Sequence, residues 1–224
     1  MNGDVQPQDA IWAVAGRWRQ REAEMRINLV RIAAVGVFYL IHLAHHWAAT
    51  HDSSLLKSLE LETGGVLSSK FHIAVTCIAV AWTMLALLVH AMLLQGRFPR
   101  WLGVASSLLD VVLLTAMLLL SSGAASPLVA GYFLIIIMAG LRLELRLVCE
   151  TAGVSIAGYL FVLGCTRWPQ GFLLDNPLPA VPRFQQLMMI AALAIAGIIV
   201  GQWIRHARRL ADDMWRAAHQ GVGR

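Results

Sequence analysis

Six long apolar stretches occupy most of this 224-residue chain and leave few folds open to it. A membrane-spanning helix needs about 20 consecutive apolar residues, and each stretch comes close to that length. The stretches cover residues 29–49, 71–94, 101–121, 126–143, 146–164 and 185–205. A hydrophobic content of 58%, against 14% charged residues, points the same way. We therefore predict an all-α fold, a polytopic membrane protein with a six-transmembrane-helix bundle, and no room for a separate soluble catalytic domain within this chain.

The distribution of basic residues predicts the orientation of the bundle. Most of the 18 Lys and Arg residues fall before or early in the first stretch, in the connections after the second and fourth stretches, and in the tail. The opposite side holds only Lys57, Lys70, Arg167 and Arg183. Because cytoplasmic loops are enriched in Lys and Arg, we expect both termini in the cytoplasm, with the protein in a bacterial inner membrane. This asymmetry accounts for the net charge of +5 without nucleic-acid binding.

The same stretches divide the chain into three segments. Residues 1–25 are polar and Arg-rich and are expected to form an amphipathic helix on the cytoplasmic surface before the chain turns inward. Residues 26–206 form the transmembrane domain, and residues 207–224 a cytoplasmic helix. In that tail, Ala207, Leu210 and Met214 continue an apolar seam with alternating four- and three-residue spacing. The seam predicts a homodimer through the last helix; the alternative is an amphipathic helix end on the membrane surface.

Histidines stand at matching depths in separate stretches. His72 and His90 are 18 residues apart, or five helical turns, so they share one helix face and lie about 27 Å apart along it. In the first stretch, His42 and His46 are one turn apart. Antiparallel packing of the first two helices brings this pair to the depth of His72. His206, at the end of the last stretch, matches the depth of His90.

Such depth-matched imidazoles are what a bis-histidine haem b requires, because the porphyrin then lies between helices in apolar surroundings. We predict one or two haem b groups, with His42, His46, His72, His90 and His206 as metal ligands. The sequence leaves open which histidine of the first stretch is the partner of His72, since His45 lies beside the other two. The alternative is that these histidines are interfacial and bind water or lipid headgroups. Covalent haem attachment is excluded because there is no CxxCH motif.

Asp110 is the other unusual residue, a carboxyl group near the middle of the third stretch. An ionisable group at that depth is costly, so it is expected either to exchange protons with a quinone or to form a structural hydrogen bond across the bundle. Walker, HExxH, GxSxG and kinase motifs are missing from the sequence. Whether the chain serves an enzyme is therefore left open, and any catalytic domain must lie outside these residues.

Two groups of short motifs resemble known families. The first comprises Asp110–Thr115, Ser122-Gly123, Ser126-Pro127-Leu128 and Tyr132-Phe133. It is similar to the six-helix sensory membrane domains of bacterial signalling proteins, including the redox-responsive histidine kinases that sense quinone. The second comprises Arg26, Phe38-Tyr39 with His42, Phe71-His72, Val181-Pro182-Arg183 and Gln202–Arg209. It resembles the membrane anchors of class III adenylate cyclases, some of which are similar to the dihaem b-type anchors of succinate dehydrogenase.

These resemblances imply haem contacts at His42 and His72, and a quinone-type site near Ser126 and Pro127. The turn before Pro127 departs from the fuller Gly-Gly-Asn-Pro-Phe pattern of the quinone sensors. The leading hypothesis is a homodimeric sensory module that binds haem b, with quinone as a second ligand, and signals to a cytoplasmic output such as a cyclase or kinase. The alternatives are a b-type electron-transfer subunit and a cofactor-free membrane scaffold.

Overall fold

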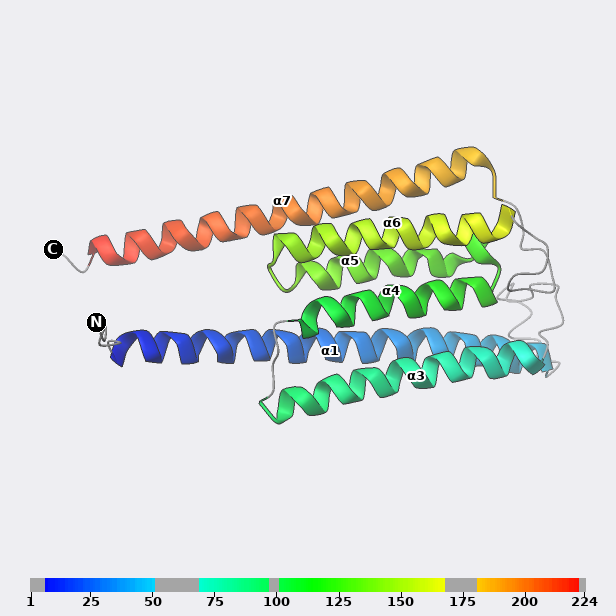
Figure 1. The fold of residues 1–224 in the computed structure, drawn as a ribbon, viewed down its shortest axis with the longest axis horizontal. Coiled ribbons are helices and arrows are strands. Elements are labelled where there is room, and N and C mark those ends of the chain that lie inside the picture. The colour runs from blue at the N-terminus through cyan, green and yellow to red at the C-terminus, as the bar shows by residue number, and fades with distance from the viewer. Residues whose placement is uncertain (1–6, 51–68, 97–100, 168–180, 222–224) are drawn as a thin grey trace. The chain divides into compact units, whose positions relative to one another are not determined.

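The computed structural model describes residues 7–50, 69–96, 101–167 and 181–221, and every regular element in these ranges is a helix. The side chains at some helix ends, those of His45 and His46 among them, lie outside the described part. The chain divides into two compact units, residues 1–100 and 101–224 (Figure 1). The predicted all-helical class is confirmed.

The first unit is an antiparallel pair of helices, α1 (Pro7–Thr50) and α3 (Ser69–Leu94). Helix α1 continues without a break through residue 25, so the predicted boundary between a surface segment and the first span does not coincide with a helix end. Three hydrogen bonds join the two helices. The bonded pairs are Asn28 with Ala86, Tyr39 with Thr76, and His42 with His72. The residue numbers rise along α1 and fall along α3, as expected for antiparallel helices.

The second unit is a bundle of four α-helices. Two short 3-10 helices lie between the first and the second of these. In chain order, the elements are α4 (Leu102–Leu120), η1 (Gly123–Ala125), η2 (Pro127–Ala130), α5 (Gly131–Gly140), α6 (Leu145–Arg167) and α7 (Arg183–Gly221). Helix α6 packs against α4, α5 and α7, and therefore forms the centre of the unit. The expected turn at residues 122–125 is η1, in which Gly123 has a positive φ of 60°. Pro127 stands at the start of η2, as the sequence predicts.

Five helices are long and apolar enough to cross a membrane. These spans are Glu24–Ala44, His72–Leu94, Leu102–Leu120, Leu145–Arg167 and Arg183–Met214. The stretch predicted as the fourth span, residues 126–143, contains a shorter apolar segment, Pro127–Gly140, part of which is 3-10 helix. Its length is about 23 Å, against roughly 30 Å of hydrocarbon. The chain is thus a multi-pass helical membrane protein, whereas six spans and cytoplasmic termini stay predictions.

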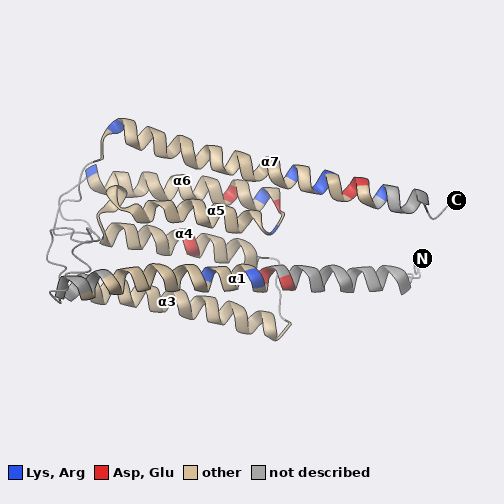
Figure 2. Ribbon diagram, turned by 180° about the vertical axis from the view of Figure 1, so that it is seen from behind, with Lys and Arg blue, Asp and Glu red and all other residues tan. Residues whose placement is uncertain are grey.

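Many large apolar side chains are exposed along the spans. Examples are Leu40 at 63%, Leu88 at 60% and Ile199 at 62% exposure. In the second unit, charged residues are confined mainly to the helix ends and the tail of α7, and the middles of the helices are almost free of them (Figure 2). A surface of this kind is stable against lipid tails rather than water.

Glycines allow α7 to pack closely against its neighbours. A Cβ atom on Gly197 would lie 2.8 Å from the Cβ of Ala152 on α6, and one on Gly201 would lie 3.1 Å from Leu145. On α5, Gly140 faces Val200 so closely that any added carbon would clash. Small residues at such contacts let the helix backbones approach, which is how membrane helices gain packing energy without a hydrophobic driving force.

Candidate functional site

The predicted histidine contact between the first two helices forms in the structure. Nε2 of His42 lies 3.2 Å from Nδ1 of His72, and the two half-buried rings are nearly parallel, with centroids 5.3 Å apart. At this distance one ring donates an N–H and the other accepts it, so at least one imidazole is neutral. His42 is thus a neighbour of His72, while the side chains of the other two candidates, His45 and His46, lie outside the described part.

The contacts next to this pair hold the two helices together. The Tyr39 hydroxyl is 3.4 Å from Oγ1 of Thr76, and Thr76 in turn donates to the backbone carbonyl of His72 at 2.8 Å. The Tyr39 ring lies 6.4 Å from that of His42. This arrangement fixes the helix faces that carry the two imidazoles.

The two imidazoles fit the donor set of a bis-histidine haem. They come from separate helices, and their ring nitrogens face each other. Two metal–imidazole bonds of about 2 Å each place the nitrogens about 4 Å apart, so the 3.2 Å gap between His42 and His72 must widen by nearly 1 Å. The described residues contain no cluster of three or more His, Cys, Asp or Glu suited to a metal ion. That finding does not bear on a site that takes only two protein ligands.

The other predicted ligands are placed as follows. His46 lies in α1, one turn beyond His42, but its side chain is outside the described part. His90 is half-buried on α3, and its Nδ1 atom is buried without a hydrogen-bond partner. The antiparallel register puts Glu24, which is buried, at the level of His90. His206 is exposed on α7, in the other unit, so its pairing with His90 stays a prediction.

Asp110 is buried in the middle of α4, with 1% of its surface exposed. It lies about one turn beyond Ser106 and Ser107, on the same face of the helix. The distance along α4 from Asp110 to Leu120 is about 15 Å. Asp110 is not among the described residues that line the cleft around Ser126 and Pro127, so the structure does not bring these predicted site residues together.

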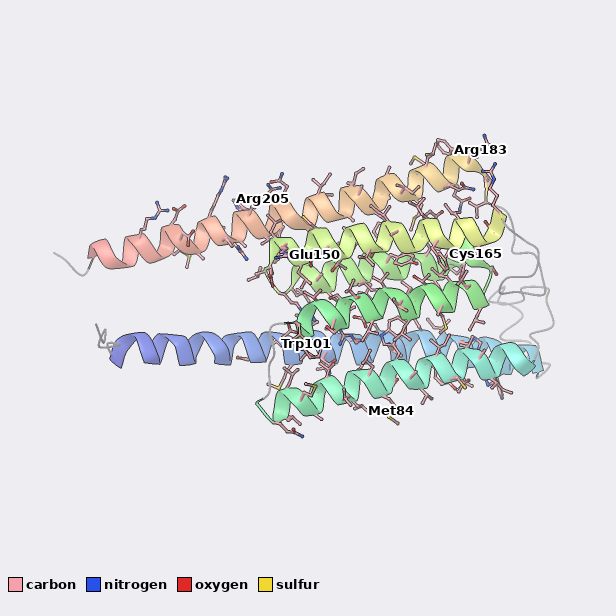
Figure 3. All side chains as sticks on the ribbon, in the orientation of Figure 1. Met84, Trp101, Glu150, Cys165, Arg183 and Arg205 are labelled. Carbon is pink, nitrogen blue, oxygen red and sulfur yellow. The ribbon has the colours of Figure 1, made fainter. Side chains whose placement is uncertain are left out.

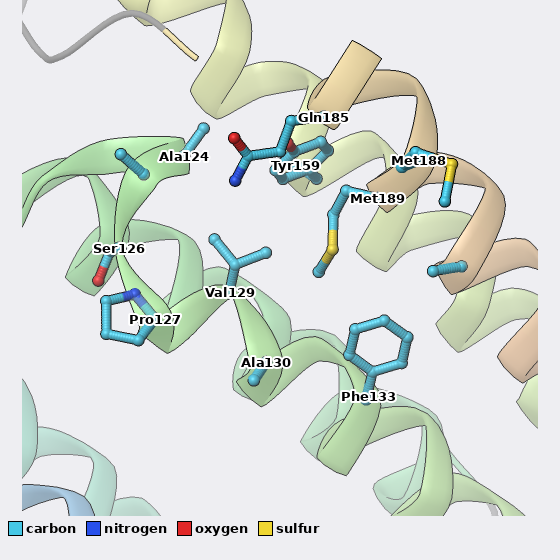
Figure 4. Close-up of a pocket in the computed structure, with 12 residues that line it drawn as sticks. Ala124, Ser126, Pro127, Val129, Ala130, Phe133, Tyr159, Gln185, Met188 and Met189 are labelled. Carbon is cyan, nitrogen blue, oxygen red and sulfur yellow. The ribbon is translucent and has the colours of Figure 1, made fainter. Parts of the chain in front are cut away.

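Ser126 and Pro127 line a cleft of about 470 Å³ in the second unit (Figure 4). Its volume falls within the usual range for small-molecule sites. The remaining lining residues come from all parts of the unit except α4: Ala124, Ala125, Val129, Ala130, Phe133, Tyr159, Gln185, Met188, Met189 and Ala192. Ser126 caps η2, because its hydroxyl accepts a hydrogen bond from the Leu128 amide at 3.3 Å. The cap and Pro127 together set the path of the chain along the cleft.

Two tyrosines near this region have different surroundings. Tyr132 is fully buried, and its hydroxyl is 2.8 Å from Oγ1 of Thr115. Gly158 leaves the space for that pair, since a Cβ atom there would lie 2.9 Å from the Thr115 oxygen. Tyr159 lines the cleft and is 1% exposed. Nothing in the sequence marks Tyr159 as a site residue, because a single tyrosine within an apolar span forms no motif with other polar residues.

An arginine fixes the turn between α5 and α6 to the start of α4. Arg142 donates to the Gly103 carbonyl at 2.8 Å, the Ser107 hydroxyl at 2.6 Å and the Ser106 hydroxyl at 3.0 Å. The next residue, Leu143, has a positive φ of 56° and offers its carbonyl to the Arg208 guanidinium of α7. The sequence predicts Arg142 only as a basic residue in the connection after the fourth stretch. The two adjacent serines in an apolar helix were the available signal for its buried role.

The three cysteines, Cys77, Cys149 and Cys165, are free thiols. Figure 3 shows Cys165 and Glu150 towards opposite ends of α6, with Arg183 and Arg205 similarly separated on α7. The helix between these two arginines is about 33 Å long, close to the thickness of a bilayer core.

Comparison with protein-family models, curated proteins and solved structures finds no match. The fold and its apolar surface thus define the class, a multi-pass helical membrane protein.

Proposed function

We propose that this protein is a membrane sensory module that binds haem b and relays redox or ligand state to a cytoplasmic output such as an adenylate cyclase or a kinase. The observation that carries the proposal is the meeting of the His42 and His72 imidazoles across two helices at 3.2 Å. Ionisable side chains within membrane spans are rare and usually functional. Two such side chains that meet from separate helices are not explained by an interfacial position alone.

His42 and His72 would hold the iron, and a bound haem b would supply a one-electron couple. The neighbouring contact between Tyr39 and Thr76 keeps α1 and α3 together below the site. Separation of the helices is therefore expected at the His42 end, which lies near the end of α1 and the start of α3. His42 and His72 would follow a change in the redox state of a bound haem, and the angle between their two helices would change with them.

The output would pass through α7 to a second copy of the chain and to a cytoplasmic partner. Helix α7 continues without a break from the cleft residues at its Arg183 end to Gly221. Leu210 and Met214, on the predicted seam, are 50% and 72% exposed in the single chain. A homodimer would bury both residues at a coiled-coil interface.

A quinone in the cleft would be the second ligand. Apolar and sulfur-containing side chains make up most of the lining, as suits a membrane-soluble ring, and Ser126 and Pro127 lie in its wall. The alternative function is a b-type electron-transfer subunit, which the same histidine pair supports equally. Transfer of electrons from reduced quinone to a partner dehydrogenase or reductase, without any change in the α7 dimer, would favour that alternative.

Absorption spectra of the purified protein test the haem site. Protein from haem-replete cells should show a b-type α band on reduction with dithionite, and His42→Ala and His72→Ala should each abolish it. The matched substitution is His206→Ala, an exposed histidine of the other unit. Its spectrum should keep the haem held by the first unit, and a fall to half the haem content would reveal a second haem at His206. A colourless wild-type protein would overturn the haem proposal and leave only the quinone and scaffold hypotheses.

A further inference from the structure

The hydroxyl group of Tyr159 has no hydrogen-bond partner among the residues that the structure describes. Only 1% of the surface of Tyr159 is exposed, and the residue lies on α6, in the membrane-spanning part of the bundle. Within the described part of the chain, its hydroxyl makes no hydrogen bond, whereas that of the equally buried Tyr132 is bonded to Thr115. Buried hydroxyl groups are nearly always hydrogen-bonded, because an unpaired one loses its bonds to water without replacement. The Tyr159 oxygen is not among the atoms that are fully closed off without a partner, so a ligand in the cleft can supply the missing bond.

A second polar group of the same cleft is also available. Gln185, at the start of α7, lies beside Tyr159 in the cleft wall (Figure 4). Its amide makes no hydrogen bond to the described residues, in contrast to the neighbouring Gln186, which donates to the Val181 carbonyl at 2.7 Å. A phenol and a carboxamide, from α6 and α7, thus converge at one part of an otherwise apolar site.

The rest of the lining determines the shape of a suitable ligand. Phe133, Val129 and the thioethers of Met188 and Met189 form the apolar part of the cleft lining. Aromatic rings and methionine sulfur pack well against the face or edge of a flat ring. A ligand that satisfies both parts has a planar apolar body and a hydrogen-bond-accepting oxygen at its rim.

We infer that Tyr159 and Gln185 are the residues that recognise the head group of the quinone assigned to this cleft, an inference that rests on the proposed function. The Tyr159 hydroxyl donates a hydrogen bond to one ring carbonyl oxygen. The Gln185 amide binds a second oxygen substituent of the same ring. Because Gln185, Met188 and Met189 all belong to α7, the bound head group contacts the helix that continues to the C-terminal seam.

Binding of a short-tailed ubiquinone analogue to the full chain in lipid nanodiscs tests this assignment. Affinity can be measured by quenching of tryptophan fluorescence. Tyr159→Phe removes one oxygen that makes no hydrogen bond to the described residues, so it should leave the thermal unfolding midpoint unchanged and weaken quinone binding about tenfold. Gln185→Leu should weaken binding by a similar or smaller factor.

Tyr132→Phe is the matched control, because it removes the same atom from an equally buried tyrosine that does not line the cleft. It should lower the unfolding midpoint, since the hydrogen bond that Tyr132 donates to Thr115 is lost while Thr115 keeps its bond to the Val111 carbonyl, and leave quinone affinity unchanged. Equal quinone affinity in wild-type and Tyr159→Phe protein would overturn the inference while the quinone proposal stands. If wild-type protein binds no quinone, the quinone proposal itself fails.

A phospholipid ester carbonyl offers the same acceptor chemistry and must be distinguished. Titration of phospholipid into detergent-solubilised protein already loaded with the quinone analogue separates the two sources. A quinone site should keep its ligand. Displacement of the quinone by phospholipid, in a manner that depends on Tyr159, would assign the cleft to lipid and contradict the quinone assignment.

Discussion

The two units of this protein hold their helices together in different ways. In the first unit, side-chain hydrogen bonds join α1 and α3 at three levels, from Asn28 to His42. In the second unit, the middle of the bundle is closed by glycines that let α7 approach α5 and α6. Its polar contacts lie mainly at the turn between α5 and α6.

The difference indicates where each unit can accept a ligand. Hydrogen bonds between membrane helices are individually modest, averaging roughly 0.6 kcal/mol, so a contact such as that of His42 with His72 can be broken at small cost. Close backbone packing cannot be exchanged in this way, because any inserted atom would collide with a neighbour. The second unit therefore has its cleft beyond the glycine contacts, at the Arg183 end of α7.

Removal of the arginine in the α5–α6 turn should have the largest effect on this comparison. Arg142→Ala deletes three hydrogen bonds from a charged donor, including the bond to the buried Ser107 hydroxyl, so we expect a loss of about 2–4 kcal/mol in the free energy of unfolding. Unfolding measured in bicelles would give the value. Arg146→Ala, which removes an exposed pair with Glu150, should have almost no effect. Equal losses for the two variants would show that the Arg142 contacts do not stabilise the unit.

An added methyl group should disturb the glycine contacts by a smaller amount. Gly197→Ala places its Cβ against that of Ala152, whose position is fixed by the α6 backbone, so overpacking should cost about 1–3 kcal/mol. The control is Gly153→Ala, next to Ala152 on α6, where a Cβ atom would meet no neighbour within 4 Å. Its stability should stay the same or rise. If both variants unfold like the wild type, the close approach of α7 is not what closes the bundle.

The smallest expected effect comes from the polar contacts of the first unit. In Asn28→Leu, the hydrogen bond to the Ala86 carbonyl and the bond accepted from Arg31 are both lost. The expected cost is about 0.5–2 kcal/mol, in line with hydrogen bonds between membrane helices. Steric trapping of α1 against α3 would measure it. A cost above that of Arg142→Ala would reverse the comparison between the two units.

The sequence predicted the helices well where apolar length alone decides them. The second predicted span, residues 71–94, is nearly identical to α3. The stretch at 101–121 agrees with α4 to within one residue at each end, and the stretch at 185–205 lies within α7. The fourth stretch was less well predicted. Hydropathy cannot show that Ser126 and Pro127 begin a 3-10 turn rather than a full span, because that depends on local capping and on contacts with α6.

The candidate sites were predictable to different degrees. The matching depth of His42 and His72 follows from helix length and periodicity, although their direct contact depends on the register set by Asn28 and Tyr39. Tyr159 could not be found from the sequence, since its distinguishing property is the missing partner of its hydroxyl. That property depends on three-dimensional packing and leaves no pattern in the chain.

The unbroken course of α7 has a mechanical consequence. From Met188 in the cleft wall to Gly221 the helix measures about 50 Å. A stiff rod of this length, held by the Gly197 contact about a quarter of the way along, would act as a lever whose far tip moves roughly 2.5 times as far as its short arm. The Arg208 guanidinium on the Leu143 carbonyl then serves as a catch on the long arm, and its release would set how far that arm swings.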